Sequence, residues 1–261
     1  MVSKYGRYVS LTNSHHITTL PYVLWGPVSS YIITTTFQNV FFIGLVLRYL
    51  VAAGNPMENG KKTEIVDLSD PSKSCLLDDI PYRIIDSVGG LLGTTPVICG
   101  GFNMSGYLDD CVLYGTSQTI TMNSQRAFHS AVQLNTSTIW ILGGMKGLRL
   151  DSTEFITPNG AVNGPTLPEP ISHACAVKFP GTGDVYLIGG GNGGLQNKVW
   201  VADTLNEFSF TQGPSMNHHR YSHVCGTMSI GAKNVIVAAG GGGVASTEIL
   251  DPTSNEWVLG K

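Results

Sequence analysis

A short apolar strand that ends in two glycines recurs along this chain, and it constrains the fold more than any other feature. Four clear copies and one degenerate copy end at positions 101, 144, 190, 241 and 55, so neighbouring copies lie 43 to 51 residues apart. Self-similarity at a period of about 20 to 50 residues indicates a repeat architecture. The copies are Ile98–Gly101, Ile141–Gly144, Leu187–Gly190, Ala238–Gly241 and, in degenerate form, Val51–Asn55.

The paired glycines have a physical role at these positions. A chain that leaves a packed strand in a tight turn, close to a neighbouring backbone, needs positive φ angles or the absence of a Cβ atom, and glycine supplies both. We therefore expect a structural role for Gly100 and Gly101, Gly143 and Gly144, Gly189 and Gly190, and Gly240 and Gly241.

Each Gly-Gly is followed by a polar loop and then by further strands. The next strand is expected at Thr63–Asp67, Cys111–Tyr114, Thr153–Pro158, Val199–Asp203 and Thr247–Pro252. A weaker third strand begins near Leu76, Ile120, Val162, Phe208 and Trp257, and a fourth follows a Pro- or Met-containing link. Four short strands per period make one antiparallel sheet, which buries both faces only by stacking against its neighbours.

This order of motifs resembles the kelch repeat of β-propellers. The fourth strand is introduced by Arg126–His129 and Arg220–His223, with Arg83–Asp86 as a weaker relative and His173 alone in the remaining copy. The tyrosine that usually follows Gly-Gly is mostly missing, and the repeat tryptophan is clear only at Trp257. The resemblance covers about residues 45–261 and implies an all-β propeller of five four-stranded blades, near 45–82, 83–125, 126–170, 171–219 and 220–261.

The two ends of the chain raise the question of closure. The last copy stops soon after Trp257, so we expect its outermost strand to be short or absent, and Tyr31–Thr36 to supply it. Residues 1–30 match no repeat and are expected to be poorly ordered, and a truncated gene product is an alternative reading. The apolar stretch Tyr31–Ala53 falls short of the roughly 20 apolar residues of a spanning helix, so β-strands are favoured over a membrane anchor.

Composition excludes some classes of partner and leaves the compartment open. A net charge of −3 argues against binding to nucleic acid or to an anionic membrane surface. Five cysteines do not make a dense disulfide framework, so we expect reduced buried thiols at Cys75, Cys175 and Cys225. Reduced thiols are also favoured at Cys99 and Cys111, with a cross-strand bridge between these two as the alternative. Two Asn-x-Ser/Thr sequences, Asn103–Ser105 and Asn135–Ser137, do not decide the compartment.

No set of residues in the sequence makes a convincing catalytic or metal site. His129, His173 and His223 are expected at equivalent places on successive innermost strands, too far apart to share one ion. A structural role is the better interpretation, and we expect no catalytic residue, no metal and no cofactor. Asp109 and Asp110 lack an identifiable partner, and the glycine-rich loops lack the features of a phosphate site.

The favoured function is therefore a non-catalytic scaffold that binds a protein partner, not identifiable from the sequence, through the blade-connecting loops. Variable loops on a rigid framework are where binding residues gather. Candidate contact residues are Asn103, Tyr107, Lys146, Arg149, Asn192 and Gln196. The alternatives are a propeller enzyme acting on a sugar, of the oxidase or isomerase type, and a truncated product without its own activity.

Overall fold

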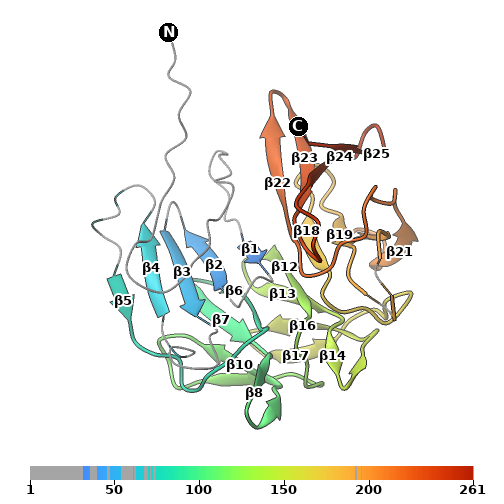
Figure 1. Cartoon of the computed structure of the whole chain (residues 1–261). Coiled ribbons are helices and arrows are strands. Elements are labelled where there is room, and N and C mark those ends of the chain that lie inside the picture. The colour runs from blue at the N-terminus through green and yellow to red at the C-terminus, as the bar shows by residue number, and fades with distance from the viewer. Residues whose placement is uncertain are drawn as a thin grey trace.

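A computed structural model describes residues 32–35, 40–45, 48–53, 61, 63–67, 70, 72, 75–191, 193–194 and 196–260. The described part of the chain is built from β-strands and contains no α-helix, which confirms the all-β class. The strands form antiparallel sheets that follow one another along the chain (Figure 1). We number these sheets I to V in chain order.

Sheets II to V each contain four strands. Sheet I comprises β1 (Ile32–Thr35), β2 (Val40–Leu45), β3 (Arg48–Ala53), β4 (Thr63–Asp67) and β5 (Cys75–Leu77). Sheet II comprises β6 (Val88–Leu92), β7 (Thr95–Cys99), β10 (Asp110–Leu113) and β11 (Thr119–Thr121). Sheet III comprises β12 (Ser130–Asn135), β13 (Thr138–Leu142), β16 (Thr153–Thr157) and β17 (Gly160–Asn163). Sheet IV comprises β18 (Cys175–Lys178), β19 (Val185–Ile188), β20 (Val199–Asp203) and β21 (Ser209–Gln212). Sheet V comprises β22 (Val224–Ile230), β23 (Lys233–Ala239), β24 (Thr247–Asp251) and β25 (Glu256–Leu259).

The hydrophobic core lies between successive sheets. Side chains alternate across a strand, so the central strand β13 serves two core regions. Ile139 and Ile141 pack with apolar residues of sheet II, whereas Trp140 and Leu142 pack with those of sheet IV. A third cluster joins sheet IV to sheet V around Ile188 and its neighbours. Sheets III and IV are thus buried on both faces by stacking against their neighbours, as the repeat pattern requires.

The strand predicted to complete sheet V at its outer edge is found elsewhere. The turn at Thr253–Asn255 folds the chain back, so Glu256–Leu259 pairs with β24 and sheet V has its own fourth strand. Strand β1 instead pairs with β2 and, at Thr35 opposite Val224, with the inner strand β22. This pairing joins sheets I and V into one nine-stranded sheet, so the prediction for Tyr31–Thr36 was wrong.

The expectation of strands in the apolar N-terminal stretch is confirmed by β1, β2 and β3. Across the residues that the structure describes, no helix has the length and apolar character needed to cross a membrane.

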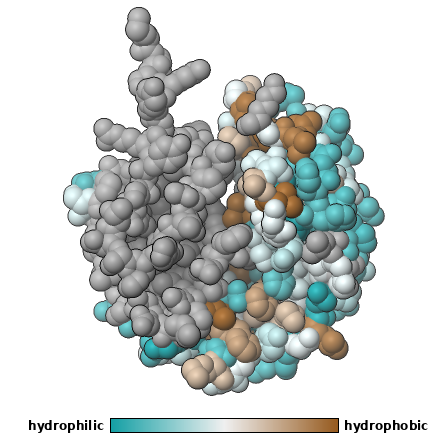
Figure 2. Space-filling model, in the orientation of Figure 1, coloured by the Kyte–Doolittle hydropathy of each residue, from teal (hydrophilic) through white to brown (hydrophobic). Residues whose placement is uncertain are grey.

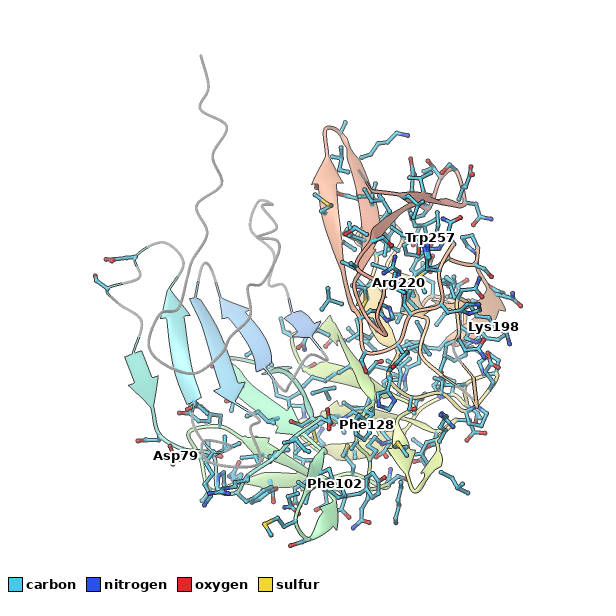
Figure 3. The ribbon with its side chains drawn as sticks, viewed as in Figure 1. Asp79, Phe102, Phe128, Lys198, Arg220 and Trp257 are labelled. Carbon is cyan, nitrogen blue, oxygen red and sulfur yellow. A yellow bond between two sulfur atoms is a disulfide. The ribbon has the colours of Figure 1, made fainter. Side chains whose placement is uncertain are left out.

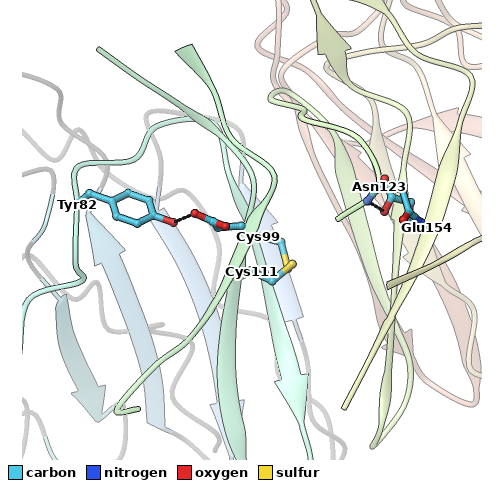
Figure 4. Close-up of a disulfide and its surroundings, with 6 residues drawn as sticks. Tyr82, Cys99, Cys111, Asn123 and Glu154 are labelled. Carbon is cyan, nitrogen blue, oxygen red and sulfur yellow. Dashed lines mark hydrogen bonds between the residues drawn. A yellow bond between two sulfur atoms is a disulfide. The ribbon is translucent and has the colours of Figure 1, made fainter. Parts of the chain in front are cut away.

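The expectation of reduced cysteines was wrong for four of them. Cys99 and Cys111 lie directly opposite each other on β7 and β10 and form a disulfide with an S–S distance of 2.05 Å (Figure 4). Cys175 on β18 and Cys225 on β22 form a second disulfide with an S–S distance of 2.06 Å. The first bond lies within sheet II and the second joins sheet IV to sheet V. The side chain of Cys75 lies outside the described residues.

Candidate functional site

The Gly-Gly turns and the links that enter each sheet gather at one end of the sheets. Antiparallel strands alternate in direction, so the turn after the second strand and the link to the next first strand share an end. We call this end the loop face, formed by residues 100–109, 143–150, 189–191, 196–197 and 240–246 together with the links 80–87, 122–129, 167–174 and 216–223. Figure 2 shows hydrophobic residues near the lower edge of the molecule, where Figure 1 places β8 and β14.

The Gly-Gly turns of sheets II, III and IV each dock onto the link of the following sheet. Gly143 and Gly144 have φ angles of 60° and 98°, and the Gly144 N–H donates to the Ile171 carbonyl oxygen at 2.8 Å. A Cβ atom on Gly143 would overlap that same oxygen, so glycine is required by both conformation and space. Gly101 and Gly190 donate in the same way to the carbonyl oxygens of Arg126 and Arg220.

The Arg126 side chain fixes the loop of its own sheet through a buried ion pair. Its guanidinium donates to Glu154 at 2.6 Å and to the Gly143 and Ser152 carbonyl oxygens at 2.7 and 3.0 Å, with both charged side chains essentially buried. The Glu154 carboxylate also accepts from the backbone N–H groups of Asn123 and Ser124. This network ties the link, the Gly-Gly turn and strand β16 together.

Sheet V repeats the arrangement at Arg220. Its guanidinium donates to Glu248 and to the Gly240 and Ser246 carbonyl oxygens, both at 2.8 Å. Burial raises the pKa of Glu248, but hydrogen bonds from Asn217 and Arg220 outweigh that effect, so the pKa lies below its usual value. The carboxylate is therefore ionised. Trp257 of the same sheet is buried and donates from Nε1 to the Pro214 carbonyl oxygen (Figure 3).

His129 and His223 are buried in two different contacts between sheets. A Cβ atom on Gly100 or Gly189 would lie within 3 Å of the His129 or His223 Cε1 atom respectively, so each imidazole covers the turn of the preceding sheet. Burial and then the neighbouring arginine lower the pKa of each histidine to about 3. Both rings are thus neutral, and the two lie in separate contacts, which does not suit a shared ion.

His173 does not occupy the equivalent position, which corrects the sequence interpretation. Judged by the contacts of the Gly-Gly turns, Ala174 is the counterpart of His129 and His223, and Ser87 rather than Asp86 is the counterpart in sheet II. His173 has a φ of 57°, as Phe128 and Ser222 have 55° and 50°. The sequence motif does not reveal this equivalence, because the uncharged Ile171 occupies the position that Arg126 and Arg220 hold in sheets III and V.

These left-handed residues form a chain across four sheets. Phe128 N–H donates to the Asp86 carbonyl oxygen, His173 N–H to that of Phe128, and Ser222 N–H to that of His173, at 2.8 to 3.1 Å. We call Asp86, Phe128, His173 and Ser222 the inner turns; Figure 3 labels Phe128 among them. The rings of Phe128 and His173 stack with centroids 4.2 Å apart. Burial raises the pKa of Asp86 to about 6.

Two hairpins extend the loop face beyond the sheets, and neither was predicted as a pair of strands. Strands β8 (Phe102–Asn103) and β9 (Gly106–Tyr107) form one, and β14 (Met145–Lys146) and β15 (Leu148–Arg149) form the other. Their tips carry exposed large apolar side chains: Met104 is 97% exposed and Leu148 is 82% exposed. The signal that could have revealed them is a glycine in or directly after each turn, Gly147 and Gly106, with φ angles of 72° and 118°.

Four of the six candidate binding residues lie on these two hairpins. Asn103 and Tyr107 are half-buried in the first hairpin, where the Tyr107 ring packs edge-on against Phe102. Lys146 and Arg149 are exposed in the second hairpin, on either side of Leu148. Gln196 is half-buried and its N–H donates to the Gly190 carbonyl oxygen, whereas Asn192 lies outside the described residues.

The second hairpin combines an exposed apolar side chain with exposed charged ones. Burial lowers the pKa of His173, and the positive charge of Arg149 lowers it further. The second hairpin therefore lies near the inner turns. Within the described part of the chain, no group of three or more His, Cys, Asp or Glu side chains could hold a metal ion. No protein-family model matches this chain, and no curated protein is significantly similar to it.

Proposed function

We propose that this chain is a kelch-type β-propeller whose loop face binds a protein partner. The recurring motifs support the family, and the stacked four-stranded sheets fit a propeller. The contact of β1 with β22 on one side and with β6 on the other supports closure, because it brings sheet I between sheets V and II. In this proposal the five sheets are blades around one axis.

The observation that carries the binding proposal is the tip of the second hairpin. A leucine that is 82% exposed directly after the Gly147 turn adds nothing to the core of this protein. Exposed apolar side chains framed by charged ones are typical of the centre and rim of a protein interface. Leu148 stands between Lys146 and Arg149, so the partner we propose presents an apolar pocket bordered by carboxylates.

The neighbouring residues support a continuous contact. Tyr221 is exposed on the loop face, and its ring lies 6.3 Å from that of His173. Aromatic side chains that are already held in place lose little conformational entropy on binding. Truncation of Leu148, Arg149 or Tyr221 is therefore expected to weaken binding of the partner most.

The test compares proteins captured by the intact chain with those captured by variants. Leu148→Asp should weaken binding of a genuine partner at least 30-fold, since an apolar anchor contributes about 2 kcal/mol or more. The matched control is Leu205→Asp, because Leu205 is 88% exposed in the β20–β21 turn at the opposite end of the sheets. A partner is accepted only if its affinity, measured by calorimetry, falls for Leu148→Asp and not for Leu205→Asp. Equal affinities for both variants would contradict the proposed face.

A further inference from the structure

The cysteines of the first disulfide occupy a place that other sheets fill with ordinary residues. Cys99 and Cys111 pair between the second and third strands of sheet II. The pairs in the same register are Leu142 with Thr153 in sheet III and Ile188 with Val199 in sheet IV. Packing alone therefore does not require cysteine at this place.

The second disulfide also occupies positions that other sheets fill with residues other than cysteine. Cys175 begins β18, where sheets II, III and V have Val88, Ser130 and Val224. Its partner Cys225 lies 50 residues further along the chain, on the inner strand of the next sheet. Two cysteine pairs, both buried and both bonded, are characteristic of proteins that fold under oxidising conditions, because reduced compartments keep thiols unpaired.

A glycosylation sequence lies on an exposed turn of the same protein. Asn135 ends β12, Thr136 and Ser137 connect it to β13, and all three are exposed. The backbone N–H and the hydroxyl of Ser137 both donate to Asn135 Oδ1, at 2.9 and 3.0 Å. This turn places the hydroxyl beside the carboxamide, and its hydrogen bonds use Oδ1 and not Nδ2, which is the atom that accepts a sugar.

We propose that this protein matures in an oxidising, glycosylating compartment and carries an N-linked glycan on Asn135. The donor is an oligosaccharide linked to a lipid diphosphate. The bond from the sugar C1 to the diphosphate oxygen breaks, a bond from C1 to Asn135 Nδ2 forms, and the amide proton passes to a base of the transferase. Each disulfide forms by exchange with a disulfide-bearing oxidant, which takes up two electrons and two protons.

The position of Asn135 fits a bulky, solvated modification. The β12–β13 turn lies at the end of the sheets opposite to the Gly-Gly turns, so a glycan there leaves Leu148 accessible. The other sequence, Asn103–Ser105, is less favourable because Asn103 is half-buried and accepts only the Ser105 N–H in its turn. The inference does not depend on the proposed binding function.

The test uses the protein purified from its natural source with free thiols blocked during lysis. Peptide mapping without reduction should show Cys99 linked to Cys111 and Cys175 linked to Cys225. Treatment with an amidase that removes N-linked glycans should lower the mass of the protein and convert Asn135 to aspartate in the corresponding peptide.

Three variants expressed through the secretory route of eukaryotic cells complete the test. Asn135→Asp keeps the Oδ1 acceptor of the turn and should lose the glycan of this peptide, whereas Ser137→Thr should retain it. Asn103→Asp is the matched control and should leave the Asn135 glycan in place. Full alkylation of Cys99, Cys111, Cys175 and Cys225 in the native protein, or an unmodified Asn135 peptide, would overturn the proposal.

Discussion

Sheets III and V differ from sheets II and IV in the interactions that fix the link entering each sheet. In sheets III and V the link arginine, Arg126 or Arg220, forms a buried ion pair with Glu154 or Glu248. Equivalent backbone hydrogen bonds place Ile171 of sheet IV at the arginine position, and Ile84 takes that place in sheet II. The strand position of the glutamate holds Val112 in sheet II and Trp200 in sheet IV.

The backbone donors of the link change together with the ion pair. The N–H groups of Asn123 and Asn217 each donate to a carboxylate at 2.6 Å. The same position is Pro81 in sheet II and Pro168 in sheet IV, and proline has no N–H to donate. A buried carboxylate is stable only when all its partners are present, so sheets III and V have the arginine, the glutamate and the backbone donor together, and sheets II and IV have none of the three at these positions.

The largest expected effect comes from breaking one polar set halfway. Arg126→Ile alone leaves Glu154 buried without its counter-charge, and we expect a loss of about 3–5 kcal/mol of unfolding free energy. The triple variant Arg126→Ile, Glu154→Val and Asn123→Pro copies the residues of sheet II and should recover more than half of that loss. Urea unfolding measures both, and a triple variant no more stable than the single one would refute the exchange of complete sets.

The disulfides should differ according to the length of chain that each one closes. On the chain-entropy model, the 50-residue separation of Cys175 and Cys225 corresponds to about 4 kcal/mol and the 12-residue separation of Cys99 and Cys111 to about 3 kcal/mol. Cys175→Val with Cys225→Ala, and Cys99→Leu with Cys111→Thr, insert residues that other sheets use. Thermal unfolding of the two variants should rank them in this order; the reverse order would contradict it.

A third difference concerns pH, because among sheets II to V the fully buried histidines lie in the two sheets with the ion pair. The pKa of His129 and of His223 is about 3 in the folded protein and about 6.5 when unfolded. The unfolded chain therefore binds protons first, and stability is lost as the pH falls from 6.5 toward 3, by up to about 1.4 kcal/mol per pH unit for each histidine.

Replacing both histidines by the residues of sheets II and IV checks this slope. His129→Ser with His223→Ala should lower stability at pH 7 but flatten its decline between pH 6 and pH 4 in denaturant titrations. Burial raises the pKa of Asp86 to about 6, so protonation of Asp86 stabilises the folded protein as the pH falls. This contribution is the same in the unmodified protein and in the double variant. An unchanged slope would show that the imidazoles are not buried as neutral rings.

The smallest effect is expected from the exposed ion pair of sheet IV. Glu169 accepts from Lys198 Nζ at 3.1 Å and from Trp200 Nε1 at 3.0 Å, and Lys198 is more than a third exposed (Figure 3). Glu169→Gln should cost less than about 1 kcal/mol in urea unfolding, since solvent screens such pairs. The same change at Glu154 should cost several times more, and equal losses would remove the distinction between the two kinds of sheet.

The sequence pattern was sufficient for the strands but not for their equivalences. The spacing of Gly-Gly motifs predicted Thr63–Asp67 and Val199–Asp203 as the strands β4 and β20. It placed His173 at the position of His129 and His223. The residues that occupy the arginine and histidine positions in this copy are Ile171 and Ala174, which the motif does not detect. The equal separation of 28 residues within both Arg–Glu pairs was a signal of the polar sets that could have been used.

Long-range pairing could not be predicted from local patterns. The bond between Cys175 and Cys225 depends on which inner strands become neighbours, and the place of β1 depends on an edge of sheet V that is 189 residues away in sequence at Thr35 and Val224. The candidate contact residues were placed on the loops by topology alone. Their combination with Leu148 at a hairpin tip required the fold.

The proposed ring depends most directly on the pairing of β1 with β22. The decisive measurement is disulfide mapping of a variant with Thr35→Cys and Val224→Cys, in a Cys75→Ser background, since paired cysteines bond only when their Cα atoms lie within about 7 Å. The matched control moves the second cysteine out of register, to Ser229 in the same strand. We predict a 35–224 disulfide in the first variant and none in the control. Free thiols at both positions, or a bond in the control alone, would contradict the ring.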